Sequence, residues 1–226
     1  MRTLAAADFT LATPPLSLDA DAIHLWYFRG TGKSEYSSTL TRLLAGYLGT
    51  APDSLEIARD AHGKPHIAVP GAADLQFNES HSGGSLIVAL SRAQALGVDI
   101  EEGPRDRPWL ALAKRFFAPA EFERLARLPS ARLGVAFIEL WSCKEAVLKA
   151  LGRGIAFGLD RLRFAWDDDG HLDGLSEIAA EAGDASGWRV VRLAPAADVS
   201  GALAWYGRDL LLQSFTARAA DRDDES

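Results

Sequence analysis

The sequence has 226 residues, enough to bury the core of one large domain or of two small domains packed together. Its formal net charge of −7 argues against a general nucleic-acid-binding protein, since such proteins bind phosphates through basic surfaces. The single cysteine, Cys143, excludes an internal disulfide and fits a reducing cytosol, and no apolar run is long enough to cross a bilayer. We therefore expect a cytoplasmic protein that binds neither nucleic acid nor a membrane.

The first predicted elements are a buried strand over residues 23–28 and a helix over residues 37–48. Between them lies Thr31-Gly32-Lys33-Ser34, which ends like a nucleotide-binding P-loop. The glycine that a P-loop needs five residues before Gly32 is Tyr27 here, so we reject a nucleoside triphosphatase. The positive charge of Lys33 remains available to a phosphate.

Two further segments carry groups suited to phosphates. A predicted strand over residues 55–58 precedes Gly63-Lys64-Pro65, a turn that presents Lys64 at a defined place. Further on, Ser80 and His81 lie within residues 77–84, where hydroxyls, an imidazole and backbone N–H groups can all donate to an anion. A purely structural turn has the same composition, so both interpretations stay open.

The next two predicted strands, residues 85–90 and 97–101, are expected to pair antiparallel. Side chains alternate along a strand, so Asp99 and Glu101 share one face. Two carboxylates this close are costly to ionise together unless a cation or a group of donors lies between them, and Mg²⁺ is the simplest such cation. The alternative is that both form the solvated face of an edge strand.

Residues 103–108 are rich in turn formers and mark the expected boundary between two halves. Beyond it the pattern predicts helices over residues 108–117, 119–128 and 130–151, then strands over residues 162–166, 188–193 and 202–206. The longest helix sets Glu145 and Lys149 four positions apart on one face, which a surface ion pair would also explain. Basic residues between positions 114 and 132 form either a docking face for an acidic partner or a solvated helix surface.

The candidate residues combine into one kind of chemistry. Asp99, Glu101 and Glu145 offer three oxygen ligands for Mg²⁺. The candidates to neutralise phosphates are Lys33, Lys64, His81 and Lys149. These groups favour phosphoryl-type chemistry on a polyphosphorylated small molecule. A Mg²⁺-dependent phosphodiesterase or nuclease with the same carboxylates is one alternative, and a non-catalytic binding module is another.

Five short motifs occur in the order and approximate spacing of the Sfp-type 4′-phosphopantetheinyl transferases, a family that the sequence resembles from about residue 63 to residue 155. They are Gly63-Lys64-Pro65, Phe77-Asn78-x-Ser80-His81-Ser82, Gly97-Val98-Asp99-Ile100-Glu101, Arg115-Phe116-Phe117 and Trp141-Ser142-x-Lys144-Glu145-x-x-x-Lys149. Each motif alone is weak, but their agreement in order makes chance improbable.

The resemblance implies an α+β fold of two similar α/β lobes related by a pseudo-twofold axis, each with a small, mainly antiparallel sheet packed on helices. The expected lobes are residues 1–102 and 103–216, followed by a flexible acidic tail over residues 217–226. The resemblance also implies a monomeric, Mg²⁺-dependent enzyme. It would transfer the 4′-phosphopantetheine arm of coenzyme A to a serine of an acyl or peptidyl carrier protein and release adenosine 3′,5′-bisphosphate.

The same resemblance implies residue roles. Asp99, Glu101 and Glu145 would hold Mg²⁺, and Glu145 would also be the candidate base, with Lys149 as its electrostatic partner. The groups facing coenzyme A would be Lys64, Ser80 and His81 at the adenosine and its phosphates, and Lys149 at the pyrophosphate.

One part of the family pattern is missing. Members commonly have an arginine-rich entry to the helix that precedes the Gly-Lys-Pro turn, whereas this chain has Ser37 and Ser38 there. Lys33 is the nearest upstream cation, so we expect it to contact the 3′-phosphate instead.

Overall fold

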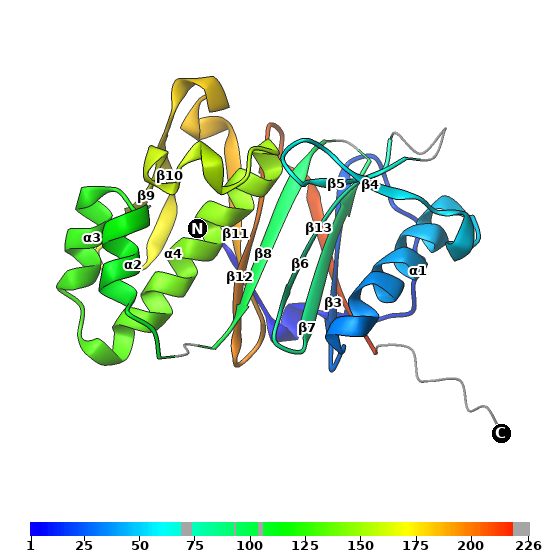
Figure 1. The fold of residues 1–226 in the computed structure, drawn as a ribbon, viewed down its shortest axis with the longest axis horizontal. Helices are drawn as coiled ribbons and strands as arrows, with labels where there is room; N and C mark the ends of the chain where they lie inside the picture. The colour runs from blue at the N-terminus through cyan, green and yellow to red at the C-terminus, as the bar shows by residue number, and fades with distance from the viewer. Residues whose placement is uncertain (69–73, 93, 104–105, 219–226) are drawn as a thin grey trace.

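The computed structural model describes residues 1–68, 74–92, 94–103 and 106–218, which form a mixed α/β fold (Figure 1). The α-helices are α1 (Tyr36–Leu48), α2 (Trp109–Phe116), α3 (Pro119–Ala126) and α4 (Ser130–Leu151). The strands of the first half are β1 (Thr3–Ala5), β2 (Thr10–Leu11), β3 (Ala22–Arg29), β4 (Ile57–Arg59), β5 (Pro65–Ile67), β6 (Gln76–Ser82), β7 (Ser85–Ser91) and β8 (Leu96–Glu102). Those of the second half are β9 (Leu162–Trp166), β10 (Leu172–Ile178), β11 (Trp188–Ala196), β12 (Val199–Tyr206) and β13 (Leu211–Arg218).

Two sheets form the centre of the molecule. One has the order β2-β13-β3-β7-β6 and the other the order β1-β11-β12-β8, while β4-β5 and β9-β10 are separate two-stranded hairpins. A shared core joins the two larger sheets, because Leu25 and Ile87 of the first pack in one cluster with Val98, Ile100 and Leu203 of the second. The sheets therefore lie face to face, with α1 outside the first and α4 outside the second (Figure 1).

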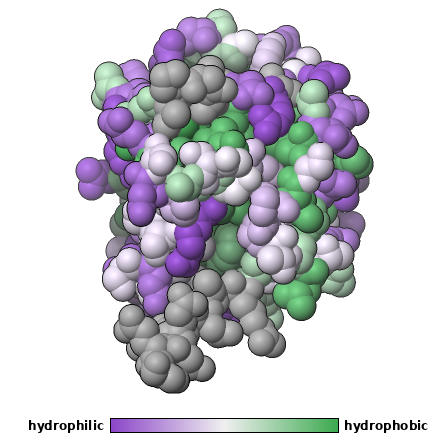
Figure 2. Space-filling model, turned by 90° about the vertical axis from the view of Figure 1, so that its right-hand side faces the viewer, coloured by the Kyte–Doolittle hydropathy of each residue, from purple (hydrophilic) through white to green (hydrophobic). Residues whose placement is uncertain are grey.

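Helix α1 covers the outer face of the first sheet. Its Leu40, Leu43 and Leu44 are buried against Trp26 and Val88 of that sheet. Figure 2 views the molecule from this side, where hydrophilic residues surround smaller apolar patches. The helix thus separates the first sheet from solvent and places its own N-terminus beside the turn between β6 and β7, where Tyr36 donates from its hydroxyl to the carbonyl of Gly83 at 2.6 Å.

Helix α4 packs very closely on strand β8. A Cβ added to Gly97 would lie 2.1 Å from the carbonyl oxygen of Ala146 and 2.3 Å from the amide nitrogen of Ala150, so only glycine permits this approach. The two backbones that carry the predicted acidic residues are therefore held against each other.

A buried ion pair ties α4 to α3 and the β9–β10 hairpin. The ammonium group of Lys144 donates to Glu121 at 2.6 Å and to the carbonyls of Leu159 at 2.8 Å and Leu162 at 2.5 Å. Glu121 in turn accepts from the backbone N–H of Phe164 at 3.1 Å. Because its hydrogen-bonding groups are occupied, this pair meets the condition under which charges can be buried.

The predicted helices and strands are present, but the structure also has strands that were not predicted, among them β6 at residues expected to form part of a turn, and some pairings differ. Strands β7 and β8 do not pair with each other: β7 lies between β3 and β6, and β8 pairs with β12. Strand β13 was not predicted; it continues through Arg218, with Ala217 buried, and so includes the first two residues of the segment expected to be a tail. Residues 219–226 lie outside the described residues.

The sheets also do not follow the expected division into residues 1–102 and 103–216. Strand β1 pairs with β11, and β8 pairs with β12, so both contribute to the sheet of the second half. Strand β13 returns to the first sheet, where it pairs parallel with β3. Each half of the chain therefore completes the sheet of the other.

Candidate active site

The candidate site forms where the edge of one sheet meets the edge of the other. Asn78, Ser80 and Ser82 alternate along β6 and accept hydrogen bonds from backbone N–H groups of β8. The distances are 2.8 Å from Val98 to Asn78, 3.3 Å from Ile100 to Ser80 and 3.1 Å from Glu102 to Ser82. Side chains of β6 thus satisfy the unpaired edge of β8, as a neighbouring strand would do through its backbone.

Asp99 and Glu101 point toward this junction from β8. The Asp99 side chain accepts from the hydroxyl of Ser80 at 3.0 Å and from the ammonium of Lys149 at 2.9 Å, both on Oδ1. Glu101 accepts from the hydroxyl of Ser82 at 3.0 Å. Because Asp99 is only 6% exposed, the alternative of a solvated edge-strand face is wrong for this residue.

Glu145 enters the same region from α4 and is 8% exposed. Burial, followed by the charge of Asp99, raises the pKa of Glu145 to about 7, with Lys149 acting in the opposite direction. Burial and Asp99 also raise the pKa of Glu101. Lys149 forms its ion pair with Asp99. The alternative explanation for Glu145 and Lys149, an ion pair between the two on the helix surface, is therefore not what the structure shows.

The oxygen atoms at this site suit a hard divalent cation by their chemistry, but among the described residues they do not form a compact set of three ligands. Oδ2 of Asp99 and Oε1 of Glu145 are buried without a hydrogen-bond partner. Such atoms are costly to bury, and a cation with oxygen ligands would satisfy both. Within the described ranges, however, no three His, Cys, Asp or Glu side chains are gathered closely enough to enclose a metal ion. The chemistry of the donor set suits Mg²⁺, while the compact three-ligand cluster expected from the sequence is not formed.

A cleft of about 390 Å³ is lined by both partners of Asp99 and brings four predicted residues together. They are Lys64, Ser80, His81 and Lys149. Arg59 and His62 line the same cleft and were missed by the sequence reasoning. The only sequence signal for them was that both come shortly before the turn that presents Lys64.

The ammonium group of Lys64 is already bound by backbone carbonyls and does not extend freely into the cleft. Its ammonium donates to the carbonyl of Lys149 at 2.7 Å and to those of Leu96 and Ala150 at 3.3 Å each. Burial lowers the pKa of Lys64. The lysine therefore links the β4–β5 hairpin to the C-terminal end of α4, where helix carbonyls lack partners within the helix.

His81 is supported from α1. Its ring stacks on that of Tyr36 with centroids 4.6 Å apart, and the Tyr36 hydroxyl bonds to the following turn at Gly83. The same turn is fixed by Glu102, which accepts from the amide of Gly84 at 2.8 Å. Gly83 has a φ of 58°, and a Cβ there would lie 1.6 Å from the Glu102 carboxylate, so the turn favours glycine at this position.

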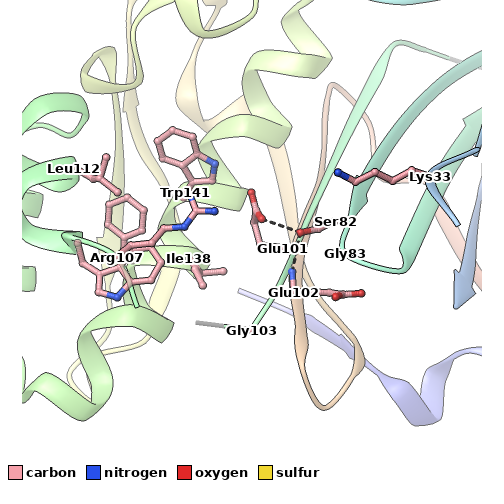
Figure 3. A pocket seen from close by; sticks show the side chains of 12 residues that line it. Lys33, Ser82, Gly83, Glu101, Glu102, Gly103, Arg107, Leu112, Ile138 and Trp141 are labelled. Carbon is pink, nitrogen blue, oxygen red and sulfur yellow. Dashed lines mark hydrogen bonds between the residues drawn. The ribbon is translucent and has the colours of Figure 1, made fainter. Parts of the chain in front are cut away.

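Lys33 lies in a different cavity. This space of about 230 Å³ has a charged wall, which includes Lys33, Glu101 and Arg107, and an apolar wall from α2 and α4, which includes Trp109 and Trp141. In Figure 3, Lys33 extends toward the cavity from one side and Trp141 and Arg107 from the other, with Glu101 between them. Lys33 is therefore not gathered with Lys64, His81 and Lys149.

Comparison with known proteins identifies the family of the chain. The family model of the 4′-phosphopantetheinyl transferase superfamily matches residues 95–207, half of the chain, which run from the start of β8 through α4 to the end of β12. The chain belongs to this superfamily. None of the helices in the described residues is long and apolar enough to span a membrane.

Individual relatives share about half of their length with this chain. The 4′-phosphopantetheinyl transferase HetI of Nostoc sp. is 39% identical over 118 residues, which cover 52% of this chain and 50% of that protein. A 4′-phosphopantetheinyl transferase of Bacillus subtilis is 35% identical and covers 55% and 53%, respectively. The transferase Sfp of Bacillus subtilis strain 168 is 34% identical and covers 52% and 50%.

Proposed function

We propose that this protein transfers the 4′-phosphopantetheine arm of coenzyme A to a serine of an acyl or peptidyl carrier protein. In the reaction the serine oxygen forms a bond to the phosphorus that carries the pantetheine, and the pyrophosphate bond breaks to leave adenosine 3′,5′-bisphosphate. The observation that carries the proposal is the ion pair of Asp99 with Lys149, near the buried Glu145 and at a cleft that Lys149 lines together with other cationic side chains.

The cleft would hold the nucleotide part of coenzyme A. Lys64, Ser80 and His81 would face the adenosine and its phosphates, and Lys149 would face the pyrophosphate. The position of all four on one cleft supports this assignment. Lys64 would have to release at least one of its carbonyl partners to bind a phosphate through its ammonium.

The three carboxylates would hold Mg²⁺. When bound, the ion would neutralise charge on the pyrophosphate oxygens, which is its usual contribution to phosphoryl-type reactions. Support comes from the unpartnered oxygens of Asp99 and Glu145 and from the mutual electrostatic effects among Asp99, Glu101 and Glu145.

Glu145 would take the proton of the carrier serine. Without a cation, burial beside Asp99 raises the pKa of Glu145 to about 7, so its carboxylate is more basic than an exposed glutamate, as a proton acceptor requires. Lys149, held by Asp99 and by the carbonyl of Val98 at 3.0 Å, would stabilise negative charge beside it.

The remaining parts of the proposal concern architecture. We infer two lobes related by a pseudo-twofold axis, because each large sheet carries one helix on its outer face and the sheets meet on their inner faces. The lobes would consist mainly of residues 1–102 and 103–216, with β1, β8 and β13 exchanged between their sheets. A monomer in the cytoplasm completes the proposal, and the buried thiol of Cys143 agrees with a reducing compartment.

The test is direct. The protein is incubated with coenzyme A, Mg²⁺ and each of several apo carrier proteins, and the intact carriers are weighed by mass spectrometry. We expect a gain equal to one phosphopantetheine arm, together with adenosine 3′,5′-bisphosphate in equal amount. Cleavage of coenzyme A without a gain on any carrier would instead identify a Mg²⁺-dependent phosphodiesterase, and no reaction with any carrier would reject the transferase.

A further inference from the structure

We propose that Ser82 is a positioning residue whose hydroxyl orients the Glu101 carboxylate for metal binding across the junction of the two sheets. This inference rests on the proposed function, because it concerns the same site. Figure 3 shows Ser82 between the carboxylate of Glu101 and the backbone nitrogen of Glu102.

The direction of each hydrogen bond follows from chemistry. The backbone N–H of Glu102 can only donate, so the Ser82 oxygen must accept from it at 3.1 Å. A serine hydroxyl has one proton, and that proton is then free to be donated to Oε2 of Glu101 at 3.0 Å. The hydroxyl is thus anchored by one residue of β8 and holds the side chain of the preceding residue.

Ser80 repeats this arrangement one step earlier along both strands. Its oxygen accepts from Ile100 at 3.3 Å, and its proton goes to Oδ1 of Asp99 at 3.0 Å. This bond and the one from Lys149 both use Oδ1, while Oδ2 of Asp99 is left without a partner. The row of serines therefore occupies one oxygen of a carboxylate and, at Asp99, leaves the other free for a ligand.

Orientation matters more for Glu101 than for Asp99. A glutamate side chain has one more rotatable bond than an aspartate, and holding a long side chain in one conformation costs entropy. Asp99 has two partners in the described structure, Ser80 and Lys149, whereas Glu101 accepts its hydrogen bond from Ser82. Partners of metal ligands typically contribute about 10- to 100-fold to metal affinity.

A purely structural role for Ser82 is the competing explanation, and Ser85 provides the matched control. The Ser85 hydroxyl donates to the carboxylate of Glu102 at 2.9 Å, so it makes the same kind of bond at the same junction. Glu102 is not among the proposed ligands. Loss of the Ser85 hydroxyl should therefore affect stability but not metal affinity.

The experiment compares Ser82→Ala, Ser82→Thr and Ser85→Ala with the parent protein. Binding of Mn²⁺, as a paramagnetic substitute for Mg²⁺, is followed by the loss of the free-ion electron paramagnetic resonance signal, and thermal unfolding is recorded for each variant. We expect Ser82→Ala to weaken Mn²⁺ binding about 10-fold. Ser82→Thr keeps the hydroxyl and should bind Mn²⁺ as the parent does, and Ser85→Ala should also leave Mn²⁺ binding unchanged. In transfer assays, Ser82→Ala should raise the Mg²⁺ requirement and leave the KM for coenzyme A unchanged.

The possible outcomes separate this inference from the proposed function. Equal Mn²⁺ affinities for Ser82→Ala and the parent, or equal losses for Ser82→Ala and Ser85→Ala, would overturn the positioning role. A loss specific to Ser82→Ala in a parent protein that binds Mn²⁺ but modifies no carrier would support the positioning role while the transferase fails. If Ser82→Ala does not fold, Ser82→Cys provides the same comparison, because a thiol is a weak donor of similar size.

Discussion

The ammonium of Lys149 lies 2.9 Å from Oδ1 of Asp99, in an ion pair that joins helix α4 to strand β8. The two residues are 50 positions apart in the sequence, yet both backbones are fixed by the contact at Gly97. The pair supplies a local positive charge beside Asp99 and Glu145, two buried carboxylates whose charges act on each other. It explains how acidic residues from both halves of the chain can be held together before any cation or phosphate is bound.

Replacing Asp99 by asparagine should abolish carrier modification. The Asp99→Asn variant keeps the size of the side chain and an oxygen that can accept from Ser80, so the fold should persist while a charged metal ligand is lost. Asp198→Asn is the control, because Asp198 is an exposed carboxylate paired with Arg29 at 2.9 Å. The measurement is the mass of the carrier over time, with circular dichroism to check folding. Normal Mg²⁺-dependent turnover by Asp99→Asn would show that the metal assignment is wrong.

The stability of the metal-free protein should depend on Glu145 between about pH 4.5 and pH 7. The pKa of Glu145 is about 7 in the folded protein against an ordinary value of 4.5, so in this window the folded state binds the proton that the unfolded state has lost. The contribution to stability is therefore present at low pH and is lost as the pH rises, by at most about 1.4 kcal/mol per unit.

Urea unfolding with a chelator present, at several values from pH 5 to pH 8, measures this dependence in the parent and in Glu145→Gln. A glutamine resembles the protonated acid, so the variant should gain stability relative to the parent as the pH rises toward 7 and then keep a constant advantage. Parallel curves for the two proteins across the whole range would contradict the raised pKa.

Lys144 should be structural although it lies next to Glu145 in the sequence. Its side chain is fully buried and bonded to Glu121, so Lys144→Met leaves a buried carboxylate without its cation. We expect a loss of about 3–5 kcal/mol in the free energy of unfolding. Lys114→Met, at an exposed position of α2, should change it by less than about 0.5 kcal/mol. Equal unfolding midpoints in urea for the two variants would refute the buried ion pair.

Gly97→Ala tests the close contact that positions the site. The new methyl group would meet backbone atoms of α4 at 2.1 Å, and backbone cannot move aside as a flexible side chain can. Overpacking of this kind typically costs about 1–3 kcal/mol. Gly84→Ala is the control for stability, since the nearest atom to its Cβ is 4.0 Å away. Thermal unfolding should show a clear loss for the first variant only, and an undisturbed Gly97→Ala would mean that α4 and β8 are less tightly packed.

Local patterns in the sequence were enough to predict the helices and the acidic residues of the site. The 3.6-residue periodicity predicted α1 and α4, and the alternation of β8 placed Asp99 and Glu101 on one face. The junction itself could not be predicted, because β6 is rich in residues with low strand propensity, such as Asn78, Ser80 and Ser82. Their backbones pair with β7, while their side chains bond to the edge of β8, about 20 residues away in the sequence.

Strand β13 was missed for a related reason. Its Leu211 is 59% exposed, while Ser214 is buried, so burial along the strand does not follow hydropathy. The partner that stabilises β13 is β3, near the opposite end of the chain, in a parallel pairing. No pattern within either segment indicates that the two strands pair. The hairpin that was expected between β7 and β8 follows the general preference of strands that are neighbours in sequence to pair with each other.

The final prediction concerns which cation contacts the 3′-phosphate of coenzyme A. Lys33 was expected from the sequence, but Arg59 lines the cleft that also contains His81 and Lys149. The Arg59 side chain is 62% exposed; its guanidinium donates to the carbonyl of Gly63 at 2.8 Å and lies 4.0 Å from the Glu79 carboxylate, and a guanidinium has five N–H donors, enough to bind an anion as well. A planar guanidinium is also well suited to a phosphate.

We therefore expect Arg59→Ala to raise the KM for coenzyme A more than the KM for dephospho-coenzyme A, about 10-fold against about 2-fold, because a charge-assisted hydrogen bond contributes roughly 1.5–3 kcal/mol. Lys33→Ala should affect both substrates alike, since Lys33 lines the other cavity. Arg42→Ala, at an exposed position of α1, serves as the control for a change of net charge. A selective loss of coenzyme A binding in Lys33→Ala but not in Arg59→Ala would assign the 3′-phosphate to Lys33 and place that group near the cavity beside Glu101.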